Sequence, residues 1–133
     1  ATVMVRTLAA GDPFVVDLVA PTNCGLLPAV GVTVTGLEAD ALYRITQPAG
    51  LTYNGWSAYS SGDLLQNAVY VAGSGVFLDS FGDGIEYATQ ELARAAFVEG
   101  SITGHSSYTF WINDDNPGDD RGGLSLSLQR MFG

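Results

Sequence analysis

Four aspartates lie close together near the end of the chain, between two strand-like segments. The stretch NDDNPGDDRGG carries carboxylates at Asp114, Asp115, Asp119 and Asp120, with a Pro-Gly turn and two glycines around them. Hard divalent cations such as Ca²⁺ take oxygen ligands that converge from a short stretch of backbone. The spacing differs from that of an EF-hand loop. The chemistry alone therefore leaves two interpretations open, a calcium site and a solvated acidic loop.

Other residues with metal-binding or catalytic chemistry are sparse. Asp79, Asp83 and Glu86 in DSFGDGIE suggest a second metal site, but a Gly-Asp-Gly hairpin turn explains the same stretch more simply. His105 is the only histidine, so we expect a surface or turn residue and no zinc site. The sequence has no Gly-x-Ser-x-Gly motif, and four clustered aspartates do not resemble a carboxylate pair with separated pKa values. We expect no enzymatic activity.

The charge balance limits the classes of partner. The chain has 14 acidic and 5 basic residues and a formal net charge of −9. Nucleic acids and anionic membranes bind through positive protein surface, so neither is expected as a partner. No apolar run approaches the ~18 residues of a membrane span. Cations, neutral sugars and other proteins remain compatible with this composition.

The elements that must position the aspartates are strands. About eight short segments alternate apolar and polar residues and are separated by Gly, Pro, Asn or Asp, which predicts an antiparallel β-sandwich or jelly roll. They are TVMVRT, PFVVDLVA, GVTVTG, ALYRIT, NAVYVAG, GVFLDS, SSYTFWIN and GLSLSLQR. One short helix is predicted over residues 89–98, where Leu92 lies at helical spacing from Ala88 and from Ala95 or Ala96 and Gly100 provides a stop. The last two strands should form a hairpin that holds the aspartate loop at its tip.

With these motifs in view, the chain resembles the PA-IL-like bacterial galactophilic lectins, a family of calcium-dependent jelly-roll sandwiches. In that family a strand ends in Asn-Asp, a Pro-Gly loop follows, and Asn-Asn-Ser-Gly-Ser opens the last strand; this chain reads TFWIND, DNPG, DDRGG and LSLSL. A family segment Gly-Trp-Ala-Ser-Tyr is matched by GWSAY at residues 55–59. GVFLDSFG resembles the strand between them, and the likeness covers roughly residues 32–129.

The resemblance implies a set of calcium ligands. Asp114 would bind through its side chain and Tyr59 through its backbone carbonyl. Asp119 and Asp120 stand where the family has two asparagines that contact both metal and sugar. The loop carbonyl that the family also uses would come from Gly118 or from Asn116.

Departures from the family pattern affect the sugar more than the metal. Two carboxylates in place of two amides should strengthen cation binding, but an ionised aspartate can only accept hydrogen bonds. The family loop is about two residues longer, and its sugar-gripping loop with His and Gln has no clear counterpart in SSGDLLQNAVYV. The aromatic residues Trp56, Trp111, Tyr53 and Tyr59 suggest a stacking platform for a sugar ring. Core packing is the alternative for both tryptophans, and Trp56, which we place in a loop, is the better sugar-binding candidate.

Two functions follow as expectations. The first is a calcium-dependent carbohydrate-binding module of lectin type that binds a neutral, galactose-like sugar or glycan. The second is a structural subunit of an extracellular filament, surface layer or matrix, stiffened by calcium. Cys24, the only cysteine, suggests a small buried hydrophobe or an intersubunit disulfide, and the apolar ATVMVRTL could pair with a neighbour's sheet edge.

We expect residues 1–133 to form one domain, with residues 1–31 outside the family resemblance. We also expect a homo-oligomer or polymer, secretion to the extracellular space, and a signal peptide that has been removed.

Overall fold

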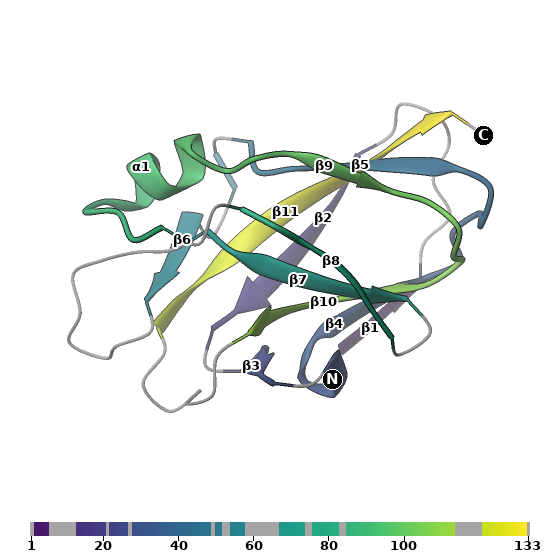
Figure 1. The fold of residues 1–133 in the computed structure, drawn as a ribbon, viewed down its shortest axis with the longest axis horizontal. Coiled ribbons are helices and arrows are strands. Elements are labelled where there is room, and N and C mark those ends of the chain that lie inside the picture. Colours follow the sequence, from purple (N-terminus) through teal and green to yellow (C-terminus); the bar gives the residue numbers. More distant parts are fainter. Residues whose placement is uncertain are drawn as a thin grey trace.

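The computed structural model describes residues 2–5, 13–20, 22–26, 28–48, 50–51, 54–57, 67–73, 76–82, 85–113 and 121–132. These residues fold into two β-sheets packed face to face as a sandwich (Figure 1). The all-β sandwich predicted from the sequence is therefore confirmed.

The first sheet has the strand order β1-β4-β10-β7-β8, with the short strand β3 paired to β10. Its strands are β1 (Thr2–Val5), β3 (Cys24–Gly25), β4 (Val32–Thr35), β7 (Val69–Gly73), β8 (Val76–Phe81) and β10 (Tyr108–Asn113). Most pairs are antiparallel, but β1–β4 and β3–β10 are parallel. The N-terminal strand, which the sequence suggested could pair with a neighbouring molecule, thus extends the sheet of its own chain.

The second sheet has the order β2-β11-β5-β9, with β6 also paired to β11. Its strands are β2 (Pro13–Val19), β5 (Leu42–Thr46), β6 (Asn54–Ser57), β9 (Gly100–Ile102) and β11 (Arg121–Phe132). The long strand β11 is the centre of this sheet, because β2 lies along one side of it and β5 and β6 share the other.

The core lies between the two sheets and follows from the alternation in the sequence. Val16 and Leu18 of β2, Tyr43 and Ile45 of β5, and alternate residues of β11 and β10 are fully buried in one cluster. The polar residues of the same strands point away from this cluster, as Asp17 and Arg44 do. All eight predicted strands are present. The structure adds the short strands β3, β6 and β9, and β6 contains Trp56, which the sequence analysis placed in a loop.

The predicted hairpin of the last two strands is wrong. β10 belongs to the first sheet and β11 to the second, and the two do not pair. The apolar faces of both strands do meet the core, since Phe110 and Ile112 on one side and Leu124 and Leu126 on the other are fully buried. Residues 114–120 therefore connect one layer of the sandwich to the other. Alternation had identified the buried face of each strand, but not its pairing partner.

The predicted helix is present but shorter, and its buried face differs. Helix α1 (Gln90–Ala95) begins after Thr89, whose side chain accepts the N–H of Leu92 at 3.2 Å. Ala93 is its only buried residue, while Leu92 is 53% exposed. Gly100 is not a helix stop: it opens β9, and a Cβ there would lie 2.1 Å from the ring of Phe81. The helix lies beside β6 at one end of the sandwich (Figure 1).

One further element is the 3₁₀ turn η1 (Pro28–Val30), which precedes β4. In the described part of the chain, no helix has the length and apolar character that crossing a membrane would require.

Candidate metal and sugar site

The predicted calcium ligands themselves lie outside the described residues. This applies to Asp114, Gly118, Asp119 and Asp120 in the aspartate loop, and to Tyr59. The structure does describe the strands on which these residues are mounted. β10 ends at Asn113, immediately before Asp114, and β11 begins at Arg121, immediately after Asp120. β6 ends at Ser57, two positions before Tyr59.

The strand that precedes Tyr59 pairs with the strand that follows the aspartate loop. In the antiparallel pair of β6 and β11, Ser57 lies opposite Arg121 and Trp56 lies opposite Gly122. The chain thus leaves β6 toward Tyr59 at the position where it enters β11 from the loop. The sequence resemblance requires these two segments to share one ion, and the register brings their described ends together.

A turn between β2 and β3 fixes both flanks of the aspartate loop. On one side the N–H of Ile112 in β10 donates to the backbone oxygen of Asn23 at 2.9 Å. On the other side the N–H of Ala20 donates to the backbone oxygen of Gly122 in β11 at 2.9 Å. A single turn therefore spans the two sheets at this point and restricts the separation of the two loop ends.

The side chain of Asn23 holds this turn in place. It is 4% exposed, its Oδ1 accepts the N–H of Val19 at 3.0 Å, and its Nδ2 donates to the oxygen of Val30 at 3.0 Å. A buried amide with both ends paired specifies one local conformation. The sequence does not single out Asn23, whose only signal is a polar side chain next to Cys24. Cys24 itself is buried as a small hydrophobe, which is one of the two expectations for it.

Trp56 is a core residue in the structure. It is 3% exposed, belongs to the main hydrophobic cluster, and donates from Nε1 to the backbone oxygen of Ala68 at 3.1 Å. A sugar needs an exposed ring face to stack on, and Trp56 offers none. The expectation that Trp56 contacts a sugar is therefore wrong, and the alternative, core packing, is confirmed. The physical reason is that its segment forms a strand and not a loop.

Trp111 is also buried, at 2% exposure, but on the opposite face of β10 from the core. Its ring centroid lies 5.6 Å from that of Tyr70 and 6.5 Å from that of Phe77. These three rings form an aromatic cluster on the outer face of the first sheet, and Phe77 is its exposed member at 53%. Tyr53, the remaining aromatic candidate, lies outside the described residues.

The second acidic stretch does not form a metal centre in the part that the structure describes. Asp79 is exposed and accepts the N–H of Ser80 at 2.8 Å, Glu86 is exposed, and Asp83 lies outside the described residues. No group of three or more His, Cys, Asp or Glu side chains with metal-binding geometry occurs among the described residues. His105 is partly exposed and packs edge-on against Tyr108, with ring centroids 5.7 Å apart.

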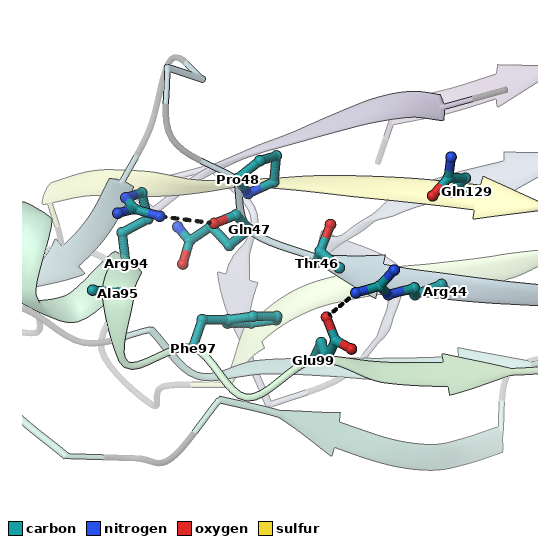
Figure 2. Close-up of a pocket in the computed structure, with 9 residues that line it drawn as sticks. All are labelled: Arg44, Thr46, Gln47, Pro48, Arg94, Ala95, Phe97, Glu99 and Gln129. Atoms are coloured by element: carbon teal, nitrogen blue, oxygen red, sulfur yellow. Dashed lines mark hydrogen bonds and ion pairs between the residues drawn. The ribbon is translucent and has the colours of Figure 1, made fainter. Parts of the chain in front are cut away.

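A polar pocket that the sequence gave no reason to expect lies between the end of β5 and the end of α1 (Figure 2). Its volume is about 390 Å³. The lining comes from three distant parts of the chain, which are residues 44–48, residues 94–99 and Gln129.

Comparisons of the chain with protein-family models, with curated proteins and with solved structures gave no match.

Proposed function

We propose that this protein is a calcium-dependent carbohydrate-binding module, with the ion held by the aspartate loop and the backbone of Tyr59. The observation that carries the proposal is the pairing of Ser57 with Arg121. Adjacent Cα atoms are about 3.8 Å apart, so the Cα of Tyr59 lies no further than about 7.6 Å from that of Ser57. The connectivity therefore allows Tyr59 and the end of the aspartate loop to contact the same ion, which supports the proposal.

Calcium has two roles in this proposal. It neutralises carboxylates that would otherwise repel one another in a short loop between the two sheets. It also offers open coordination positions, since Ca²⁺ accepts six to eight oxygen ligands and flexible geometry. Two vicinal hydroxyls of a neutral sugar can fill such positions. The net charge of −9 is consistent with a cation and a neutral ligand.

A thermal melt tests the proposal. The chelator-treated protein is compared with the same protein in calcium and in calcium with galactose. A ligand at a hundredfold excess over its Kd adds about 2.7 kcal/mol of stability, which is several degrees for a domain of this size. We expect a shift with calcium, and a further shift with galactose that requires the calcium.

Two substitutions identify the site in this experiment. Asp114→Asn should lose the calcium shift. Asp40→Asn, which removes the same charge from an exposed turn outside the loop, should retain it. A protein whose melting temperature does not respond to calcium would contradict the metal site and the carbohydrate-binding function together. A calcium shift without any response to galactose or to other neutral sugars would contradict only the second.

A structural subunit of an extracellular assembly is a second candidate function, favoured by strand β8. Among the described strands it is the last one in its sheet, and Val76, Phe77 and Leu78 are 65%, 53% and 38% exposed. An edge strand with exposed apolar residues is a site for the addition of a further strand. If the chain is such a subunit, it should sediment as a large polymer in calcium, and Phe77→Asp should dissociate it. A small species of constant size contradicts this function.

A further inference from the structure

The pocket beside α1 contains an unusual buried group, the side-chain amide of Gln47. Gln47 is 5% exposed, and neither its Nε2 nor its Oε1 has a hydrogen-bond partner among the residues that the structure describes. Leaving a buried polar group unsatisfied costs about 1–3 kcal/mol. The residue lines the pocket, and in Figure 2 its amide extends toward the side of the pocket formed by Arg94 and Phe97. The fold therefore places a hydrogen-bond donor and an acceptor at the wall of the cavity, where their burial reduces the stability of the protein.

The charges in the pocket are already balanced. Arg44 forms an ion pair with Glu99 at 2.6 Å, and Arg94 in the last turn of α1 forms one with Glu91 in the first turn. Each guanidinium has five N–H donors, so several remain for a ligand. Because each cation is matched by a carboxylate and the whole chain carries −9, the pocket has no excess positive charge that would select an anion.

The hydrogen-bonding needs of Gln47 also argue for a neutral ligand. Its Nε2 must donate and its Oε1 must accept, so the partner has to accept and donate as well. A carboxylate only accepts and would place its oxygen against Oε1, while a phosphate is an anion that the balanced charges of the pocket do not select. An ammonium group only donates. A hydroxyl group does both, and Thr46, Gln129 and Glu99 supply further donors and acceptors elsewhere in the lining of the pocket.

The pocket also has an apolar side and a size suited to a small ligand. Phe97 packs partly against the core and lines the cavity together with Pro48 and Ala95. An apolar surface of this kind complements the C–H face of a sugar ring. A volume of about 390 Å³ lies at the lower end of the range for small-molecule sites.

We propose that this pocket binds one neutral sugar ring, whose hydroxyls pair with the Gln47 amide and with the two arginines. This binding is independent of calcium, because the described residues of the lining belong to β5, α1, β11 and the segments that follow β5 and α1. Glu91 holds Arg94 through its Nε and Nη2, while Nη1 makes only a long contact of 3.5 Å with the backbone oxygen of Gln47. Nη1 is therefore the donor of Arg94 that a ligand hydroxyl would contact.

The side-chain NH₂ signals of Gln47 report directly on this binding. A ¹⁵N-labelled sample in chelator is titrated separately with galactose, glucose, mannose and N-acetylglucosamine, and in another series with sodium phosphate. At least one sugar should shift the Gln47 signals, while those of Gln90, exposed on α1, should stay in place. Phosphate should not shift them. Gln47 signals that respond to none of the four sugars, or that respond to phosphate as strongly, would overturn the proposal.

Two substitutions separate this pocket from the calcium site. Gln47→Met keeps the length of the side chain but removes both polar atoms, so it should abolish the sugar response and raise the melting temperature. Asp114→Asn should leave the response in chelator unchanged. Thr46→Val is a second pocket variant, on the other face of β5, and should weaken binding without removing a buried group. Sugar-induced shifts elsewhere in the pocket that persist in Gln47→Met would overturn the assignment, whatever the result at the aspartate loop.

Discussion

The backbone oxygen of Asn23 accepts the N–H of Ile112 at 2.9 Å, and this bond ties the turn after β2 to the strand that leads into the aspartate loop. The Asn23 side chain holds the turn through Val19 and Val30. Asn23→Ala removes the partners of two partly buried backbone groups, the N–H of Val19 and the oxygen of Val30. We expect it to reduce the free energy of unfolding by about 1–3 kcal/mol, measured by urea denaturation.

The same substitution should also weaken calcium binding, because the loop ends lose a contact that restricts their separation. Thr22→Ala is the matched control, because Thr22 lies in the same turn but is exposed. The stability and the calcium affinity of this variant should stay close to those of the parent chain. If Asn23→Ala and Thr22→Ala behave alike, the Asn23 side chain does not anchor the loop.

Trp56 should matter for stability and not for sugar binding. Trp56→Phe removes the hydrogen bond from Nε1 to Ala68 and leaves space in the core beside β6. We expect a loss of about 1–3 kcal/mol in the free energy of unfolding, in the range for a buried large-to-small change of this size. The affinity for sugar in the folded variant, measured by calorimetry, should be unchanged. A large fall in that affinity would contradict this prediction and indicate that Trp56 contacts the sugar.

The sequence predicted strands well because alternation reports which face of a segment is buried. It predicted strand pairing poorly for the same reason. Tyr108, Phe110 and Ile112 point inward, and so do the leucines of β11, but two inward faces can meet across a sandwich as easily as they can lie side by side in one sheet. The local pattern is identical in both cases. Only the long-range pairings of β10 with β4 and β7, and of β11 with β2 and β5, distinguish them.

The sites show the same division between local and long-range information. The aspartate loop is visible in the sequence because its carboxylates are neighbours along the chain. The Gln47 pocket is not visible, because Arg44, Arg94 and Gln129 become neighbours only when β5, α1 and β11 pack together.

Helix α1 was predicted, but the prediction of its buried face was wrong. Helical spacing favoured Leu92, while packing against β6 and Asn67 buries Ala93.

Stability should fall at high pH through Tyr108. Burial raises the pKa of Tyr108 above its ordinary value, and the N–H of His105, which donates to its hydroxyl oxygen, opposes this only in part. In the unfolded chain tyrosine has a pKa of about 10, so the unfolded chain releases this proton at a lower pH than the folded chain does. The folded state therefore loses stability as the pH rises above about 10 toward the raised pKa of the folded state. Urea denaturation at a series of pH values should show a smaller alkaline loss for Tyr108→Phe than for the parent chain, and equal losses would contradict the role of Tyr108.

The carboxylates at positions 119 and 120 should favour the ion at the expense of the sugar. Asp119→Asn combined with Asp120→Asn introduces the amide pair that the lectin family has at these positions and removes two negative charges from the loop. Calcium affinity depends on the number of charged ligands, so calorimetry should show a Kd for calcium that is roughly tenfold higher or more. Each asparagine adds an N–H donor that an ionised aspartate lacks, so galactose should bind more tightly in saturating calcium. Asp40→Asn should change neither affinity. A double variant with undiminished calcium affinity would mean that these two carboxylates do not bind the ion.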